Sequence, residues 1–253
     1  MRCQAGGGQV TLRPMADNDD ARPRATLLLT RPRAMSERFA AEVAERDLPV
    51  DIVIVPLMEI VATDAPPSLT ADTGVIFTSS QAVARAGPGD GRRAWCVGAR
   101  TTEAARTAGF DAVLAGACAD VLVAQLLQER PSGPLVHLRG RHQRGDVAAR
   151  LCDAGLQVTS HVLYDQVEVP PGAAFTTALR HSPLWVPLFS PRSAELFAAA
   201  ARERWTPAPD DAIVALSAAV MAGVPPEWAE KTEVIEHPDG PSMLDAIARR
   251  IYP

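Results

Sequence analysis

Hydroxyl-bearing residues stand at four places where a buried apolar run leads into a predicted helix. They are Thr30 before Arg31, Thr78 before Ser79, Ser190 before Pro191, and Ser217. In parallel sheets, ligands bind at the carboxyl ends of strands, where hydroxyls and the N–H groups of the next helix bind carboxylates or phosphates. Each residue taken alone is more typical of a helix N-cap. Four equivalent strand ends together favour a shared anion-binding cleft.

The most basic stretch of the chain is HLRGRHQRGDVAAR, residues 137–150, directly after a predicted strand. Its arginines, among them Arg139 and Arg144, can hold carboxylates through paired donors. A solvated loop leading into a helix is the other interpretation of this stretch. His137 and His142 lack a third ligand at recognisable spacing, so we expect no metal site here.

Tyr164 ends the predicted strand 158–164 and is one of two tyrosines in the chain. A phenol at a strand end, beside a crossing between domains, can donate a hydrogen bond to a leaving oxygen. The alternative is a tyrosine that only packs between domains. Pattern alone leaves both interpretations of Tyr164 open.

Several common site motifs are missing from the sequence. Gly98 ends the phrase AWCVG and can open an anion-binding turn, although a tight strand-to-helix turn explains it as well. There is no GxGxxG or GxxxxGK[ST] phrase, so nothing indicates a nucleotide site. There is also no GxSxG elbow, and no Cys/His or carboxylate pair is placed for nucleophilic or glycosidic chemistry. The sequence therefore fits a site that works without a cofactor.

Strands that alternate with short helices must position these residues. The expected strands are 25–30, 50–56, 74–78, 94–98, 111–114, 135–138, 158–164, 184–189, 212–216 and 233–235. Runs such as ATLLLT and VDIVIVP suit strands buried on both faces, and Ser36 is a candidate N-cap for a helix over 36–46. Such alternation predicts parallel sheets with helices on both faces.

Two Pro-rich crossings, near DAPPS and VEVPPG, interrupt the alternation, whereas a simple tandem of domains would need one. We therefore expect an α/β fold of two similar parallel-sheet domains joined by a two-stranded linker, one domain inserted into the other. The cleft between such domains is a common ligand site. The expected boundaries are 24–57 with 172–253 for domain 1, 64–160 for domain 2, 58–63 and 161–171 for the linker, and 1–23 for a disordered lead.

Composition excludes several classes of function. The net charge of −5 argues against a broad nucleic-acid surface. Residues 1–23 lack the apolar segment of a signal peptide, and no apolar run approaches the roughly 20 residues of a membrane span. Cys3, Cys96, Cys118 and Cys152 are far apart, as expected for reduced thiols. We expect a cytoplasmic protein with no nucleic-acid or membrane partner.

Taken in order, phrases over residues 25–253 resemble the uroporphyrinogen-III synthase family. The matching phrases are LLLTRP (27–32), DIVIVPLMEI (51–60), GVIFTSSQAV (74–83), VGARTTEAARTAG (97–109), LVHLRGRHQRGDVAARLCDAGLQVTSHVLYDQV (135–167), LFSPRSAELF (188–197), AIVALSAAVMAGVP (212–225) and PSMLDAIARRI (241–251). No single phrase is diagnostic; the ordered set together with the inserted-domain plan carries the resemblance.

The resemblance implies a cofactor-independent hydro-lyase of heme biosynthesis. Its substrate is hydroxymethylbilane, a linear tetrapyrrole with many carboxylate side chains. The bilane loses its hydroxyl as water and closes through a spiro intermediate to uroporphyrinogen III, with ring D inverted; without an enzyme it closes to the uninverted isomer. The resemblance also implies a monomer, with the upstream bilane-forming enzyme as a candidate partner.

By position, Tyr164 matches the family's tyrosine that helps the hydroxyl to leave. The matching cleft-lining hydroxyls are Thr78, Ser79, Thr101, Ser190 and Ser217. One segment departs from the pattern: the family's usual IGxTT reads VALSAA at 214–219. This departure keeps open a non-catalytic tetrapyrrole- or anion-binding module of the same fold. A hinge-type binding protein for another small anion is a third hypothesis.

Overall fold

The computed structural model describes residues 24–63, 65–142 and 145–252. Among these, the residues up to Glu59 and from Glu168 onward form one compact unit, here unit 1, and Ile60–Val167 form unit 2. Both divisions fall inside the segments that the sequence marks as linker, 58–63 and 161–171. The expected lead, residues 1–23, lies outside the described residues.

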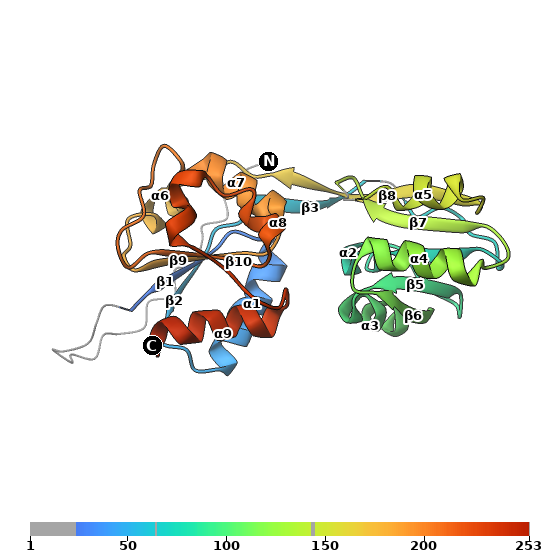
Figure 1. The fold of residues 1–253 in the computed structure, drawn as a ribbon, viewed down its shortest axis with the longest axis horizontal. Helices are drawn as coiled ribbons and strands as arrows, with labels where there is room; N and C mark the ends of the chain where they lie inside the picture. The colour runs from blue at the N-terminus through green and yellow to red at the C-terminus, as the bar shows by residue number, and fades with distance from the viewer. Residues whose placement is uncertain (1–23, 64, 143–144, 253) are drawn as a thin grey trace, which may run out of the picture. The chain divides into compact units, whose positions relative to one another are not determined.

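Unit 1 is built on a five-stranded parallel sheet with the strand order β11-β10-β9-β1-β2 (Figure 1). Its strands are β1 (Thr26–Leu29), β2 (Asp51–Ile54), β9 (Leu184–Leu188), β10 (Ala212–Ala215) and β11 (Thr232–Val234). Its helices are α1 (Arg33–Glu45), α6 (Ala173–Ala178), α7 (Pro191–Ala201), α8 (Ala218–Met221), the 3-10 helix η1 (Pro226–Lys231) and α9 (Gly240–Ile251).

Helices cover both faces of this sheet, which explains why β1, β9 and β10 are wholly buried. Leu27 and Leu29 pack with residues of α1 and α9, whereas Leu28 packs on the other face with residues of α6 and α7. Continuous apolar strands suit such two-sided burial. β2 is an edge strand with Asp51 exposed, so the expected two-sided burial of the run at 50–56 is wrong.

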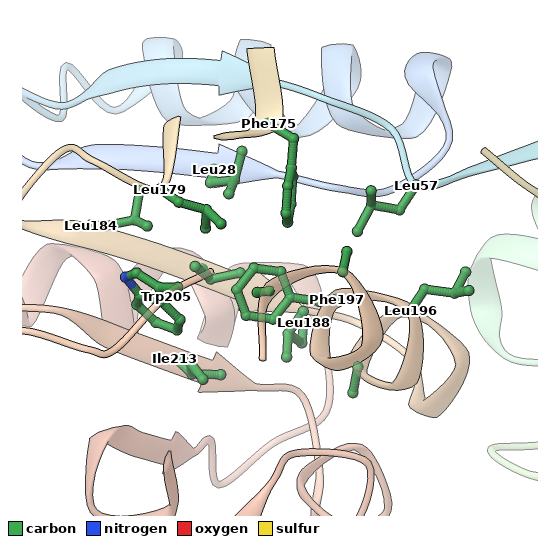
Figure 2. Packing of buried hydrophobic residues seen from close by; sticks show 14 of the residues in the cluster. Leu28, Leu57, Phe175, Leu179, Leu184, Leu188, Leu196, Phe197, Trp205 and Ile213 are labelled. Carbon is green, nitrogen blue, oxygen red and sulfur yellow. The ribbon is translucent and has the colours of Figure 1, made fainter. Parts of the chain in front are cut away.

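Aromatic side chains fill the core under α6 and α7. The Phe197 ring lies 6.1 Å from Phe175, 5.6 Å from Trp205 and 5.8 Å from Trp228 between ring centroids. Figure 2 shows Phe197 and Trp205 facing Leu28 and Phe175 across this cluster. The contacts of Phe197 with Phe175 and Trp205 are edge-to-face, and such contacts stabilise a core beyond their buried area. They link α7 to α6 and to the segment after α7.

The helix α1 begins at Arg33, directly after Pro32 at the N-cap position. The expected N-cap at Ser36 is therefore wrong. Proline lacks an N–H and its fixed φ suits a helix start, so Pro32 begins the helix earlier. Ser36 is buried within α1, and its hydroxyl donates to the carbonyl oxygen of Arg31 at 3.0 Å. This bond ties the helix to the residue that follows β1.

Unit 2 contains a six-stranded sheet with the order β3-β8-β7-β4-β5-β6 (Figure 1). Its strands are β3 (Met58–Ala62), β4 (Gly74–Phe77), β5 (Arg93–Val97), β6 (Asp111–Gly116), β7 (Leu135–Gly140) and β8 (Val158–Glu168). Its helices are α2 (Ser80–Val83), α3 (Ala99–Thr107), α4 (Ala119–Glu129) and α5 (Val147–Asp153). The central strands pair in parallel, with α2 and α3 on one face and α4 and α5 on the other.

In each sheet the order in which successive strands are added reverses once, at a topological switch point. In unit 1 the chain moves outward from β1 to β2, and later in the opposite direction from β9 to β10 and β11. In unit 2 it moves from β4 to β5 and β6, then from β7 to β8 on the other side. A parallel α/β sheet forms its ligand-binding crevice at such a switch point, outside the carboxyl ends of the strands. The pairs β1/β9 and β4/β7 therefore mark the two expected crevices, and the α/β class with parallel sheets is confirmed.

The start of β9 depends on the buried carboxylate of Asp211, which precedes β10. Its Oδ1 accepts from the Leu184 amide at 2.8 Å and from the Ser182 hydroxyl at 3.1 Å, and its Oδ2 accepts from the Ala208 amide at 2.8 Å. The side chain is 4% exposed. Asp211 thus fixes β9 beside β10 at the amino end of the sheet.

Asp211→Ala is expected to lower the free energy of unfolding by about 3 kcal/mol, because it leaves two amides without an acceptor. Chemical denaturation measures the change. Asp210→Ala is the matched control, since Asp210 is exposed and only its main-chain oxygen accepts a bond, from Trp185. Equal losses in the two variants would contradict the role given to the Asp211 carboxylate.

Candidate functional site

Three of the predicted strand-end residues meet at one edge of unit 1. Because β10, β9 and β1 are neighbouring parallel strands, the residues that follow them lie at the same carboxyl edge. These residues are Ser217 after β10, Ser190 after β9, and Thr30 with Arg31 after β1. The shared anion-binding cleft expected from four such strand ends stays a prediction.

Arg31 bridges the switch point between β1 and β9. Its guanidinium carbon lies 3.9 Å from the ring centroid of Phe189, the residue that follows β9. The Phe189 ring packs edge-on against Phe39 of α1, with centroids 4.9 Å apart. Stacking on an aromatic face holds a guanidinium in a fixed orientation and leaves its edges free to donate. Arg31 is therefore positioned to present planar donors at the crevice.

The Arg31 guanidinium has no carboxylate within salt-bridge distance among the described residues. Glu42, the nearby acid, pairs with Arg38 at 3.5 Å. Burial, together with the charge of Arg38, lowers the pKa of Arg31 to about 10, against the opposing effect of Glu42. The group stays charged at neutral pH. A half-buried cation without a counter-charge is costly, and an anionic ligand would relieve that cost.

Thr30 contributes a second unmet polar group at the same strand end. The residue is 1% exposed, and its hydroxyl oxygen is buried with no hydrogen-bond partner among the described residues. Thr30 is no helix cap, because Pro32 occupies the N-cap position of α1. Buried polar atoms are nearly always paired, so an exception needs an explanation. A bound ligand is one such explanation.

Ser190 and Ser217 both occupy helix N-cap positions. Ser190 forms a capping box with Ser193: its hydroxyl accepts from the Ser193 amide at 3.1 Å, and the Ser193 hydroxyl accepts from the Ser190 amide at 3.0 Å. Ser217 occupies the N-cap position of α8 without a side-chain cap bond. Capping therefore explains Ser190 fully and leaves the Ser217 hydroxyl without a cap bond.

Thr78 and Ser79 follow β4 in unit 2, and only one of the two hydroxyls caps a helix. Ser79 is the N-cap of α2, and its hydroxyl accepts from the Gln81 amide at 3.2 Å. The Thr78 hydroxyl lies 3.1 Å from Nε2 of His137 on β7. Because β4 and β7 flank the switch point, this hydrogen bond spans the switch point of unit 2.

Gly98 is the N-cap of α3 and has a φ of +77°, with open space where a Cβ would stand. Glycine is therefore required by the backbone conformation rather than by crowding. Thr101 lies inside the first turn of α3 and is 6% exposed. The tight-turn interpretation of Gly98 is confirmed, and its role toward an anion stays a prediction.

Tyr164 does not end its strand as expected, because β8 continues to Glu168. The pairing of β7 with β8 shifts between Arg139 and Gly140, whose partners are Val162 and Tyr164. Leu163 is thus an extra residue, a β-bulge. Leu163 and Tyr164 therefore both enter the buried cluster on the α2 and α3 face, instead of alternating between faces.

The Tyr164 ring lies over Gly140, where any Cβ would stand 2.5 Å from the ring's Cζ. The residue is 5% exposed, and its hydroxyl makes no hydrogen bond to the described residues. The guanidinium carbon of Arg85 lies 5.6 Å from the ring centroid. Packing accounts for the ring, whereas the hydroxyl stays available to a ligand.

In the basic stretch 137–150, Arg139 and Arg141 make hydrogen bonds to neighbouring protein groups. Arg139 donates from Nε to the Ser160 hydroxyl at 2.6 Å and from Nη1 to the carbonyls of Gly140 and Arg141. Arg141 donates to Asp165 at 2.7 Å. Arg144 lies outside the described residues. The expected carboxylate contacts of Arg139 and Arg144 stay predictions.

Three residues near these sites carry signals that sequence patterns did not single out. Arg192, in the first turn of α7, has a buried Nε without a partner among the described residues. Arg85 gains a role only because α2 places it beside Tyr164. His137, considered above only as a metal ligand, is instead the partner of Thr78.

Other site types find little support in the described part of the chain. No group of three or more His, Cys, Asp or Glu side chains there could hold a metal ion. Cys96, Cys118 and Cys152 are free thiols, and Cys3 lies outside the described residues. None of the described helices combines the length and apolar character needed to cross a membrane.

Comparison with known proteins shows which family this chain resembles. The family model described as "Uroporphyrinogen-III synthase HemD" matches residues 37–222, well over half of the chain. A crystal structure of uroporphyrinogen-III synthetase from Helicobacter pylori 26695 is similar, with 12% identity, a TM-score of 0.62, and coverage of 89% of this chain and 99% of that one.

A crystal structure of a mutant uroporphyrinogen III synthase from Thermus thermophilus shares 15% identity at a TM-score of 0.53, covering 90% of this chain and 99% of that one. Both likenesses establish the fold. A search of curated proteins by sequence found no match. The family model covers β2 through α8 and so includes the residues after β4, β9 and β10. The chain therefore belongs to the uroporphyrinogen-III synthase family.

Proposed function

We propose that the carboxyl edges of the two sheets bind the carboxylates of hydroxymethylbilane while Tyr164 helps its hydroxyl to leave. The reaction is that of the family: closure of the linear tetrapyrrole to uroporphyrinogen III in heme biosynthesis, with ring D inverted, water lost and no cofactor. The proposal includes a cytoplasmic monomer that receives its substrate from the bilane-forming enzyme.

The observation that carries the proposal is the unpaired charge of Arg31. A guanidinium fixed on Phe189 has two parallel donors that match one carboxylate. The buried hydroxyl of Thr30 stands in the adjacent residue. A substrate carboxylate matches the charge and the fork geometry of Arg31, whereas an uncharged substrate would leave the charge unpaired. Arg192, beside Ser190, is a further donor for the same edge.

Besides binding the carboxylates, the side chains need to assist only one chemical step, the loss of the hydroxyl. When the C–O bond of the bilane's hydroxymethyl group breaks, the oxygen takes up a proton and leaves as water, and the pyrrole ring delocalises the positive charge. The hydrogen that ring D loses as a proton on closure balances the proton taken up. A hydrogen bond from the Tyr164 hydroxyl to the departing oxygen favours that step. Ring D then attacks through its substituted carbon. The protein's main contribution is to hold the conformer that makes this attack possible and to exclude direct closure.

Purified protein supplied with hydroxymethylbilane and no added cofactor is expected to form uroporphyrinogen III faster than the spontaneous reaction forms the uninverted isomer. Chromatographic separation of the isomers measures the result. If only the uninverted isomer appears, at the spontaneous rate, the chain is no synthase. Tight binding of the tetrapyrrole in that case would support the non-catalytic module instead.

Arg31→Met is expected to raise KM for the bilane about 10-fold or more, since a charge-assisted fork is lost. The same change should leave the free energy of unfolding unchanged or raise it, because an unpaired half-buried charge is removed. Steady-state kinetics and chemical denaturation measure the two effects. The control is Arg33→Met, since Arg33 is exposed and pairs only with Glu37 at 3.8 Å. An unchanged KM in Arg31→Met would remove Arg31 from the site.

Tyr164→Phe is expected to lower kcat about 100-fold while KM and stability change little, because only the proton donor is lost. Gly140→Ala should also lower kcat, since its Cβ would displace the Tyr164 ring although the hydroxyl is intact. Tyr252→Phe is the matched control at the exposed second tyrosine. A parental kcat in Tyr164→Phe would reduce Tyr164 to a packing residue.

A further inference from the structure

We propose that His137 is a positioning residue for substrate binding: its Nε2–H donates to the Thr78 oxygen, so that the hydroxyl proton of Thr78 is free for a substrate carboxylate. The inference rests on the proposed function, in which the carboxyl edge of unit 2 binds the bilane. It assigns to His137 an action through Thr78 and no contact with the substrate.

The geometry places the two side chains across the switch point of unit 2. Ile76 of β4 is the register partner of His137 on β7, and Thr78 follows two residues later. Alternate residues of a strand share a face, and diagonal neighbours on paired strands are within reach of long side chains. The observed separation between Thr78 Oγ1 and His137 Nε2 is 3.1 Å.

The position of the imidazole proton follows from the other ring nitrogen. Nδ1 of His137 is buried and has no hydrogen-bond partner among the described residues. A neutral imidazole has one N–H donor and one acceptor nitrogen. Buried N–H groups without a partner are rarer than acceptors without one. The lower-cost tautomer therefore has its proton on Nε2, where Thr78 accepts it.

The imidazole is neutral at neutral pH, so it has one N–H donor and not two. Burial, together with the charge of Arg139, lowers the pKa of His137 to about 4, against the opposing effect of Asp146. At neutral pH the ring thus offers a single donor. If the proton were on Nδ1, the Thr78 hydroxyl would have to donate to Nε2, and it would have no proton left for a ligand.

A polar residue at position 137 is otherwise hard to explain. His137 is 1% exposed on a strand whose neighbours Leu135, Val136 and Leu138 are buried apolar residues. A leucine would fill such a space without the cost of burying an incompletely paired polar group. That cost is consistent with a function at the crevice. The Thr78 hydroxyl, only half-buried, is the group through which His137 can act on a ligand.

The tautomer can be tested without any substrate. In protein labelled with ¹⁵N-histidine, long-range ¹⁵N–¹H correlation spectra distinguish a protonated from an unprotonated ring nitrogen. The chain has five histidines, and His137→Gln identifies the signals of residue 137 by their disappearance. We expect Nε2 protonated and Nδ1 unprotonated near pH 7. Protonation of Nδ1 would overturn the inference whatever the protein's activity.

A double-mutant cycle tests the action through Thr78. Thr78→Val removes the hydroxyl and should raise KM about 10-fold or more; His137→Leu should raise it about 3- to 10-fold in the parent. In the Thr78→Val background, His137→Leu should change KM by less than about 2-fold, because nothing is left to orient. Equal effects of His137→Leu in both backgrounds would contradict positioning through Thr78.

Two controls separate positioning from folding. His137→Gln keeps an N–H donor and should recover part of the KM lost in His137→Leu; failure to recover it in a protein with parental thermal stability would overturn the inference. His181→Leu, at an exposed loop position, should behave as the parent. Parental turnover to uroporphyrinogen III is measured first, so a failure of the proposed function is distinguishable from a failure of the His137 cycle.

Discussion

The reversal of strand order in each parallel sheet is the constraint on which the rest of the structure depends. At β1/β9 and at β4/β7 the connecting helices leave to opposite faces, so the carboxyl ends of neighbouring strands are not covered by one continuous helix layer. Every well-supported candidate residue stands at one of these two places or in the strands beside them. The sheets need buried apolar strands to form: β4, β9 and β10 are apolar throughout, and polar candidate residues follow their carboxyl ends.

At both switch points a polar group lacks a hydrogen-bond or charge partner, and the kind of group differs between the two units. In unit 1 the unmet group is a charge: Arg31 is held on an aromatic ring with no carboxylate partner among the described residues, next to the unpaired Thr30 hydroxyl. In unit 2 it is a neutral atom, Nδ1 of the buried His137, whose other ring nitrogen lies 3.1 Å from the Thr78 hydroxyl. Both arrangements lower stability, because buried polar groups normally find partners. In each unit, a bound carboxylate would recover that loss.

Much of this arrangement follows from patterns that the sequence displays. Alternating apolar runs and short helices predict the parallel sheets, and a hydroxyl after each run predicts which residues reach the carboxyl edge. The pairing of Thr78 with His137 is not predictable in this way, because it needs the order of strands, and β7 is far from β4 in the chain. The exposure of β2 is not predictable for the same reason: an apolar run does not reveal whether its strand lies at the edge of the sheet.

The bulge at Leu163 shows why the packing and catalytic interpretations of Tyr164 are not alternatives. In a regular strand, Leu163 and Tyr164 would face opposite sides of the sheet, and one of them would leave the cluster that contains Phe77. The extra residue places both on the same face, and Gly140 gives the aromatic ring room. Burial of the ring then fixes the direction of the phenol, whose oxygen has no protein partner among the described residues. A proton donor must be held still to act on a leaving group, so the contacts that make Tyr164 a core residue are the ones that a catalytic phenol at this position requires.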